Sequence, residues 1–376
     1  MHTLYIRFDI GPSGVPEEFS GASAVLCART PEEVPGVLRQ MDEARRGGAW
    51  LAGYASYELG YALEPKLATL MPANRRMPLI QFAVFDAPVV ASDLPDFDNA
   101  ITAFQPKWSR QQYADAFKVV AECIVSGDFY QANLTLQLEA TVEGDILGYY
   151  AALAERQPTP YGAYVDFGEG VKILSRSPEL FFEIDKSGNI RTRPMKGTAP
   201  RDVDPLIDRA LAEGLAADEK NRAENLMIVD LLRNDLSRVC EVNSVKVPKL
   251  FEIETYATVH QMVSKIEGQL RAEIDVTDLF CALFPCGSIT GAPKIRAMEV
   301  LNELETAPRD VYCGAIGWMA PDGRSRFSVA IRTVIVFDET RAVLNVGGGI
   351  VYDSTAASEY EEALWKARFA NLSSKI

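Results

Sequence analysis

The sequence predicts an α+β protein in which large antiparallel β-sheets pack together and helices lie on the outside. Predicted strands outnumber predicted helices, and hairpin-like spacings between the strands are common. Residues 130–140 alternate between apolar and polar side chains, which is typical of a strand with one packed face. With 376 residues, of which 48% are hydrophobic and 24% charged, the chain has ample material for a core.

The chain divides near residue 100. Residues 1–100 read as short strands and turns, with an aromatic and glycine-rich stretch at 49–65. A connector rich in proline and aspartate follows at 86–100. We therefore expect an N-terminal region of residues 1–100 and a second domain of residues 105–376.

The second region begins with a helix and a strand of clear pattern. The helix carries Tyr113, Phe117, Val120 and Ile124 on one face and should end near Gly127. In the strand that follows, one face is apolar (Tyr130, Ala132, Leu134, Leu136, Leu138, Ala140) and the other polar (Gln131, Asn133, Thr135, Gln137, Glu139). The polar face is expected to border water or a polar cavity.

The remaining elements follow from their periodicity and from turn residues. We expect strands at 171–184, around 257–267, at 313–320, at 326–337 and at a segment carrying Gly347–Gly349, and helices at 216–236, 293–303 and 356–371.

The composition excludes several classes of protein. A net charge of −14 argues against a nucleic-acid binder. No apolar run is long enough to span a membrane and the N-terminus lacks a signal-peptide pattern, so we expect a cytosolic protein with no membrane contact. The six scattered cysteines are expected to be reduced. With only His2 and His260, a Ser-His-Asp hydrolase or a multi-histidine metal site is excluded.

Two predicted helices place carboxylates on apolar stripes. Glu224 lies in register with Ile228 and Leu231, and Glu362 lies in register with Trp365, with Glu359 one turn earlier. A buried carboxylate needs a partner. For Glu362 that partner is expected to be Lys366, and for Glu224 a neighbouring arginine; alternatively both helices converge on one Mg²⁺ ion.

Two cations have unusual surroundings. Arg332 sits in a strand predicted to be apolar on both faces, so it either pairs with a buried acid or clamps a carboxylate or phosphate. Lys196 lies beside Gly197 in the loop "RTRPMKGTAPR". It is either a solvated surface charge or an amine held still as a nucleophile or anion ligand.

Two glycine loops offer backbone amides to a ligand. The loop "CGSITGAPK" departs from the phosphate-loop pattern, which makes a nucleotide-binding protein a weak alternative. Pro293 in that loop is expected at the first position of a helix. The triple glycine at Gly347–Gly349 permits close backbone approach or a strand bend.

Nine motifs in chain order carry a resemblance to a known family. They are "GDFYQANLTLQ", "SRSPELFF", "RPMKGTAPR", "AENLMIVDLLRNDLSRV", "TVHQMVS", "FPCGSITGAPK", "AIRT", "GGGIVYDS" and "SEYEEALWKA", spread over residues 112–370. Together they resemble the chorismate-utilising enzymes, which include anthranilate synthase component I, aminodeoxychorismate synthase component I and the isochorismate and salicylate synthases.

Two positions indicate which branch of that family the chain resembles. Family members that add water carry a lysine base where this chain has Gln131, so the resemblance implies an ammonia user. Anthranilate synthases carry a small residue where this chain has Lys196, whereas the aminodeoxychorismate branch carries the lysine. In that branch the lysine attacks C2 of chorismate, the C4 hydroxyl leaves, and ammonia then adds at C4 to give 4-amino-4-deoxychorismate. Such an amine must be uncharged, so a lowered pKa is expected for Lys196.

The resemblance also assigns roles to other residues. Glu179 matches the general acid/base, and Glu224 and Glu362 match the Mg²⁺ ligands, with Glu359 a weaker candidate. The implied chorismate-binding set is Gly197, Thr198, Trp318, Arg332, Gly347, Gly348, Gly349 and Lys366. Anthranilate synthases have a histidine where Gln261 stands here, so His260, one residue earlier, is expected to be a core residue rather than a catalytic one.

The resemblance implies partners as well. The chain offers no histidine for a glutaminase centre, so ammonia is expected from a separate glutaminase subunit or from free ammonia. A separate lyase is expected to complete p-aminobenzoate for folate. Two alternatives remain open: anthranilate synthase component I, and a catalytically silent chorismate-binding subunit.

Overall fold

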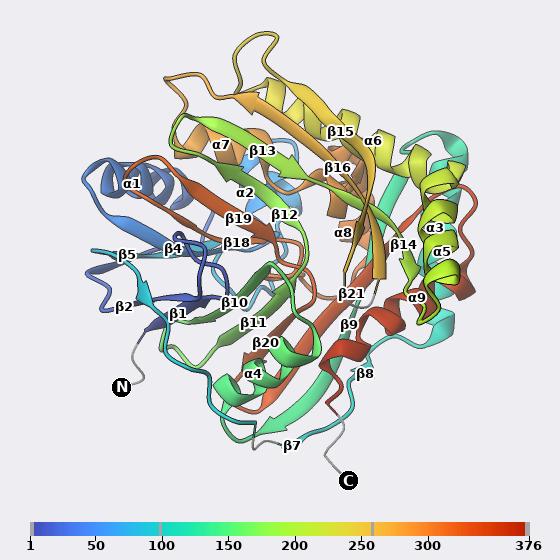
Figure 1. Cartoon of the computed structure of the whole chain (residues 1–376), viewed down its shortest axis with the longest axis horizontal. Helices are drawn as coiled ribbons and strands as arrows, with labels where there is room; N and C mark the ends of the chain where they lie inside the picture. The colour runs from blue at the N-terminus through green and yellow to red at the C-terminus, as the bar shows by residue number, and fades with distance from the viewer. Residues whose placement is uncertain (1–3, 98–99, 257–258, 373–376) are drawn as a thin grey trace.

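Two large antiparallel sheets form the centre of the molecule, which confirms the predicted fold class (Figure 1). The computed structural model describes residues 4–97, 100–256 and 259–372. His2 and the first two residues of the strand predicted at 257–267 lie outside the described residues.

The first sheet has its longest ladder near one edge, where β9 and β21 pair over ten residues from Arg341 with Thr141 to Ile350 with Ala132. Its strands, in spatial order, are β17 (Gly291–Ala292), β9 (Gln131–Glu143), β21 (Arg341–Ile350), β20 (Thr333–Phe337), β11 (Lys172–Ser177), β10 (Tyr161–Asp166), β1 (Tyr5–Phe8), β2 (Glu17–Ser20) and β6 (Val89–Val90); β7 (Ala100–Ile101) and β8 (Gln105–Pro106) also pair with β9.

The second sheet faces the first. Its strands, in spatial order, are β14 (Met195–Pro200), β16 (Val259–Gln269), β13 (Asn189–Arg193), β12 (Leu180–Ile184), β19 (Ser325–Val329), β18 (Ala315–Met319), β4 (Trp50–Ala55), β5 (Ile80–Phe85) and β3 (Ala24–Ala28); β15 (Lys246–Thr255) also pairs with β16.

Helices cover the outer faces of both sheets. They are α1 (Val34–Arg46), α2 (Leu59–Leu63), α3 (Arg110–Ser126), α4 (Ile146–Arg156), α5 (Pro205–Ala217), α6 (Glu219–Ser237), α7 (Val276–Leu283), α8 (Lys294–Leu304) and α9 (Ala356–Lys366). One apolar cluster fills the space between the sheets, a second lies between the first sheet and α3, α4 and α9, and a third lies between the second sheet and α1, α6 and α7. The architecture is therefore a sheet sandwich with an outer helical layer on each side.

The N-terminal 100 residues do not form a sheet of their own. β1 pairs with β10 in the first sheet, and β4 pairs with β18 in the second. The predicted division near residue 100 therefore follows the order of the chain but not the hydrogen bonding of the sheets.

Two segments predicted as single strands are each broken where the chain crosses between the sheets. Residues 171–184 form β11 in the first sheet and β12 in the second, with Pro178 and Glu179 between them. Residues 326–337 form β19 in the second sheet and β20 in the first, and Arg332 between them has a φ of 49°. A proline cannot donate to a ladder and a positive φ leaves the extended region, so neither segment can continue as one strand.

Several element boundaries also differ from the prediction. Tyr130 precedes β9 and is 73% exposed, so it does not belong to the packed face. The helix predicted at 216–236 is α6, which starts after the Asp218 cap. Pro293 precedes α8 instead of opening it, and the last helix ends at Lys366, followed by a short 3₁₀ turn.

Other expectations were met. α3 ends at Gly127 in the left-handed conformation, as predicted for its stop signal. The six cysteines form no disulfide. Within the described part of the chain, no helix combines the length and apolar character needed to cross a bilayer.

Candidate functional site

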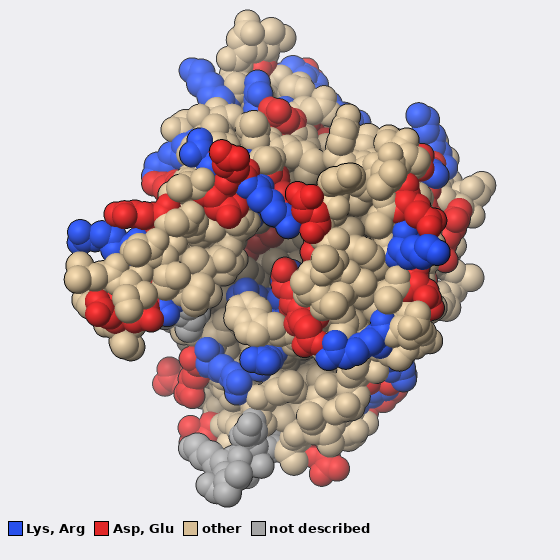
Figure 2. Space-filling view, turned by 90° about the vertical axis from the view of Figure 1, so that its right-hand side faces the viewer, with Lys and Arg blue, Asp and Glu red and all other residues tan. Residues whose placement is uncertain are grey.

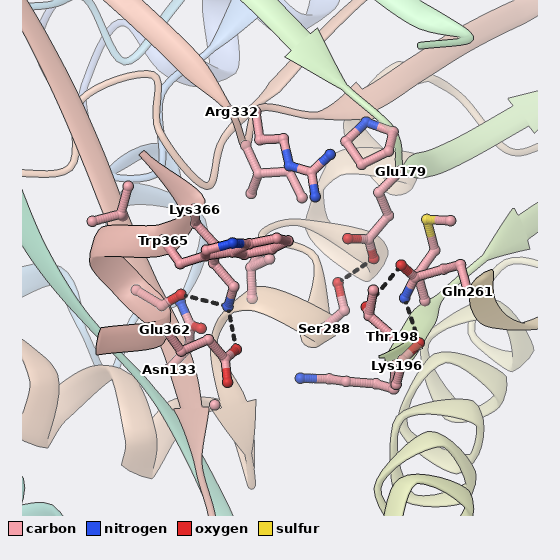
Figure 3. Close-up of a pocket in the computed structure, with 18 of the residues that line it drawn as sticks. Asn133, Glu179, Lys196, Thr198, Gln261, Ser288, Arg332, Glu362, Trp365 and Lys366 are labelled. Carbon is pink, nitrogen blue, oxygen red and sulfur yellow. Dashed lines mark hydrogen bonds and ion pairs between the residues drawn. The ribbon is translucent and has the colours of Figure 1, made fainter. Parts of the chain in front are cut away.

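A cavity of about 710 Å³ opens where β14 of the second sheet approaches β9 and β21 of the first, with α6 and α9 alongside. Its volume is in the range of small-molecule sites. Figure 2 shows this face hollowed near its centre, with acidic and basic side chains around the opening. The cavity brings together most of the predicted site residues, several of which are seen in Figure 3.

Lys196 projects into this cavity from β14 (Figure 3). Its Nζ would lie 3.1 Å from a Cβ added at Gly349, and its amine makes no hydrogen bond or ion pair among the described residues. Burial lowers the pKa of Lys196, and the positive charge of Lys366 lowers it further, although Glu224, Glu179 and Glu362 oppose the shift. The predicted lowering of the pKa thus has a structural cause. An unpaired amine with a lowered pKa is suited to nucleophilic attack.

The loop around Lys196 is fixed by its neighbours. Gly197 has a φ of +87° and would place a Cβ 2.9 Å from the Asn221 side chain, so only glycine fits there. Thr198 donates from its hydroxyl to the amide oxygen of Gln261 at 2.9 Å, and Gln261 donates to the carbonyl of Gly197 at 2.8 Å. Gln261 therefore fixes the position of Gly197 and Thr198, the two residues that follow Lys196 in β14.

Glu179 lies at the crossing between β11 and β12 and is buried. Ser288, from the loop before α8, donates its hydroxyl proton to Oε1 of Glu179 at 2.7 Å. Burial raises the pKa of Glu179 to about 7, even though the Ser288 hydrogen bond and the nearby Lys196 both act to lower it. A carboxyl group with this pKa can both donate and accept a proton near neutral pH.

Three carboxylates from two helices line the same cavity, namely Glu224 on α6 and Glu359 and Glu362 on α9. Burial raises the pKa of Glu224 and of Glu359, and the negative charge of Glu362 raises both further. Burial would also raise the pKa of Glu362, but the ion pair with Lys366 at 2.8 Å outweighs it and lowers the pKa. The i,i+4 pair predicted from the sequence is thus present inside the cavity.

The donor set fits a hard divalent cation. Among residues 4–97, 100–256 and 259–372, no three His, Cys, Asp or Glu side chains are gathered closely enough to form a metal cage. Mg²⁺ does not require one, because it usually binds one or two carboxylates and keeps several waters or substrate oxygens. A Cβ added at Gly348 would lie 2.8 Å from Oε2 of Glu359 and 3.9 Å from Oε1 of Glu362, so both carboxylates reach the same point on β21.

Arg332 lines the cavity and makes no ion pair within the part of the chain that the structure describes. The amide of Gln157, with its oxygen toward the guanidinium, accepts a hydrogen bond from Nε of Arg332 at 3.3 Å. Burial lowers the pKa of Arg332. Of the two alternatives left by the sequence, the buried pair with an acid is therefore absent, and the guanidinium is available to an anionic ligand.

Gln131 on β9 is fully buried, and neither its amide oxygen nor its amide nitrogen has a partner among the residues that the structure describes. Its Nε2 would lie 2.8 Å from a Cβ added at Gly349, the same glycine that adjoins Lys196. Gln131 thus lies beside the lysine and offers an amide, not a base, to what binds there.

The other predicted site residues fall into two groups. Gly347, Gly349 and Lys366 line the cavity, and Nζ of Lys366 donates to the carbonyl of Gly347 at 2.9 Å. Gly348 adjoins the carboxylates from the other face of β21.

The assignment of Trp318 to the binding set is wrong. Its side chain is 3% exposed in the core between the sheets, where it packs against Trp50, and it does not line the cavity. The inward face of β18 is filled by that core, so its indole has no path to a ligand.

His260 lies in a polar network away from the cavity. It is 2% exposed, and its ring nitrogens contact Asp208 and Thr255 at 2.9 Å each. The expectation that it is a buried structural residue is confirmed.

Some cavity residues carried no role in the sequence-based prediction. They include Ser288, Asn133, Asn345, Gln261 and Trp365. Asn133 belongs to the polar strand face that had already been expected to border a cavity. Ser288 lies in the glycine loop, where only backbone amides had been considered. Trp365 had been assigned to the packing stripe of the last helix.

The family profile described as "chorismate binding enzyme" matches residues 90–371, well over half of the chain. The chain belongs to this family. Aminodeoxychorismate synthase component 1 of Salmonella typhimurium is 44% identical over 265 residues, which cover 70% of this chain and 58% of that protein. This chain therefore spans less than two thirds of the length of that relative.

Solved structures agree with the family's fold. Anthranilate synthase component I of Streptococcus pneumoniae superposes with a TM-score of 0.76 at 30% identity, over 86% of this chain and 81% of that chain. The menaquinone-specific isochorismate synthase of Escherichia coli gives the same TM-score at 19% identity, over 98% of this chain and 89% of that chain, which supports the fold alone.

Proposed function

We propose that this chain aminates chorismate at C4 with ammonia, giving 4-amino-4-deoxychorismate through a covalent adduct on Lys196. The observation that carries the proposal is the unpaired Lys196 amine, with a lowered pKa, in a cavity that also contains a buried acid. Relatives such as the Salmonella protein, described as aminodeoxychorismate synthase component 1, support the same reaction.

The first half of the reaction forms the adduct. Neutral Nζ of Lys196 bonds to C2 of the substrate ring, the ring double bond shifts, and the C4–O bond breaks. Glu179 gives its proton to the departing hydroxyl, which leaves as water. In the second half ammonia bonds to C4, the ring double bond shifts back and the C2–N bond breaks to free the Lys196 amine, and the extra proton on the new C4 amine returns to Glu179.

Charged groups position the substrate. The guanidinium of Arg332, which has no acidic partner among the described residues, binds one carboxylate of the substrate, a geometry that arginine favours. Mg²⁺ would be held by Glu362 and Glu359, which reach the same point on β21, with water and substrate oxygens completing its shell and Glu224 lining the same cavity; when bound it supplies positive charge for the other carboxylate.

Gln131 supports ammonia as the nucleophile. A glutamine cannot take a proton from water, so a water molecule at this place gains no base, whereas ammonia needs none to attack. We propose that a separate glutaminase subunit supplies the ammonia, and that a separate lyase carries the product to p-aminobenzoate for folate.

The direct test incubates the purified chain with chorismate, Mg²⁺ and an ammonium salt and identifies the product by mass spectrometry. We expect aminodeoxychorismate from the wild type and almost none from Lys196→Ala. Without ammonia, intact-protein mass spectrometry should detect substrate bonded to Lys196. Lys107→Ala serves as a matched control, because Lys107 pairs with Glu139 at the surface and neither residue lines the cavity. Full turnover by Lys196→Ala overturns the proposal.

Anthranilate synthase component I is the second candidate, because a solved structure of that enzyme shares 30% identity with most of this chain. The two products differ, since anthranilate is released after loss of pyruvate and is fluorescent. Formation of anthranilate would favour this candidate and remove the covalent role of Lys196. A catalytically silent subunit predicts chorismate binding with no product of either kind.

A further inference from the structure

Trp365 is a tryptophan without a structural partner. It lies in the last turn of α9, lines the cavity and is 48% exposed. Within the described residues it makes no ring stacking, cation–π contact or hydrogen bond, and it belongs to none of the three apolar clusters. In contrast, Trp108 and Trp318 are buried, and Trp50 packs against Trp318. Such a large apolar side chain, half in water, gains stability only when something covers it.

The indole lies across the cavity. In Figure 3 it is seen between Arg332 and the ion pair of Glu362 with Lys366, with Glu179 and Lys196 on the far side of the same space. Trp365 is three residues after Glu362, so the helix turn that carries this carboxylate also carries the indole on the same face. A planar ligand held by Arg332 would therefore meet the flat face of the indole.

We propose that Trp365 covers the bound substrate and keeps bulk water from C4 of the lysine adduct, so that ammonia completes the reaction. This inference rests on the proposed function. C4 of the adduct is electrophilic, so either ammonia or water can attack it. If water attacks, a C4–O bond forms, the C2–N bond to Lys196 breaks, the proton of water returns to Glu179, and chorismate is regenerated without net reaction.

The return of the adduct to chorismate can be detected with an oxygen isotope. In H₂¹⁸O it replaces the C4 hydroxyl oxygen of unreacted chorismate, and mass spectrometry measures the exchange. The ratio of ¹⁸O exchange to amination reports which nucleophile reaches C4, independently of how much enzyme is folded or how much substrate is bound.

We expect Trp365→Ala to raise this ratio by about tenfold, and Trp365→Phe, which keeps a flat ring, to stay close to the wild type. Tyr352→Ala is the matched control: Tyr352 is another exposed aromatic, 76% exposed in the connection before α9, and it does not line the cavity. Its ratio should equal that of the wild type. Because Trp365 lies outside the apolar clusters, its variants are expected to fold, which circular dichroism can verify.

A second measurement requires no turnover. Chorismate added with Mg²⁺ and without ammonia should change the tryptophan emission of the wild type, and Trp365→Phe should lose most of that change. Normal amination by Trp365→Ala with an unchanged exchange ratio overturns the proposal. Absence of amination in the wild type overturns the proposed function instead; in that case the emission change alone decides whether Trp365 covers the ligand.

Discussion

Glu179 and Lys196 have pKa shifts in opposite directions with the same main cause. Burial disfavours the charged form of each, so it raises the pKa of the acid and lowers the pKa of the amine. The positive charge of Lys366 adds to the effect on Lys196. Burial therefore shifts both groups toward their uncharged forms, a proton donor and a nucleophile, which is the combination that adduct formation requires.

The first prediction concerns the pH dependence of adduct formation. The rate should fall as the pH rises above about 7, because Glu179 loses the proton it must donate, and should fall in acid, because Lys196 becomes charged. Ser288→Ala removes a hydrogen bond that favours the ionised carboxylate, so it should raise the pKa of Glu179 and move the alkaline limb to higher pH. Single-turnover mass spectrometry across the pH range measures both limbs. A shift of the alkaline limb to lower pH in Ser288→Ala would contradict this account.

The second prediction concerns stability. Because the pKa of Glu179 is raised from 4.5 to about 7, its protonated form is favoured by folding; this contribution is complete below pH 4.5 and is lost as the pH rises through about 7. The loss is on the order of 3 kcal/mol. Glu179→Gln should therefore have a higher free energy of unfolding than the wild type at about pH 8, with little difference at about pH 4. Urea denaturation at both pH values measures the difference; an equal difference at the two values would rule out this origin.

At the scale of single residues, the sequence predicted the place of some residues in the cavity better than that of others. Glu224 and Glu362 stood out because a carboxylate on an apolar stripe needs a partner, and both line the cavity. Trp365 was misassigned because the last helix ends at Lys366, so the apolar residues after it do not continue its stripe. Trp318 was taken from family resemblance alone, and burial between the sheets excludes it.

At the scale of the secondary-structure element, adjacent residues of β21 adjoin two different parts of the site. Successive positions in a strand point to opposite faces. A side chain at Gly348 would meet Glu359 and Glu362, whereas one at Gly349 would meet Gln131 and Lys196. The glycines let the strand pass between the carboxylates and the nucleophile.

A matched pair of variants separates these two contacts. Gly348→Ala should raise the Mg²⁺ concentration needed for half-maximal activity, because its methyl group would press on Glu359. Gly349→Ala should slow adduct formation at saturating Mg²⁺, because its methyl group would press on Gln131 and Lys196. Neither position has a positive φ, so strain in the backbone is not expected. Mg²⁺ titrations and single-turnover rates for both variants provide the measurement; identical effects of the two variants on both quantities would count against the assignment.

The elements themselves were predictable where one face is polar. The alternation over residues 130–140 predicted β9 because its two faces have different surroundings. The segments 171–184 and 326–337 lack such alternation because apolar layers lie on both sides of their strands, so nothing in their pattern marks the crossing between sheets.

At the scale of the whole molecule, the N-terminal 100 residues complete both sheets. β1, β2 and β6 extend the first sheet beyond β10, and β3, β4 and β5 extend the second beyond β18. Side chains from β1 and β4 also enter the core between the sheets, among them Ile6 and Tyr54. The region is therefore part of the same folding unit as the site.

A truncation provides the test. A chain that starts at residue 105 should be insoluble or lack a cooperative thermal transition, because the edges of β10 and β18 and part of the central core would be exposed. Circular dichroism and chorismate binding, with the full chain as control, measure the effect. A soluble fragment that unfolds cooperatively and binds chorismate would show that residues 105–376 are a domain of their own, as the sequence had suggested.

The fold class was predictable as a whole because the number and spacing of strands do not depend on which sheet each strand joins. The place of the N-terminal strands in both sheets was not, because it depends on long-range pairing such as that of β4 with β18. A proline-rich connector marks a change of local structure and carries no information about hydrogen bonds formed elsewhere.

The two crossings at Glu179 and at Arg332 lie at one seam. The carbonyl of Glu179 accepts from Val329 at 3.1 Å, and the carbonyl of Arg332 accepts from Arg176 at 2.9 Å, so each crossing segment is tied to a strand next to the other. Glu179 and Arg332 are therefore each tied to neighbouring strands at this seam, whereas Lys196 is carried by β14 at the edge of the second sheet. We therefore expect a substitution that loosens β14 to slow bond formation at Lys196 more than it weakens substrate binding, because the proton donor and the guanidinium are held by the seam and not by that edge strand.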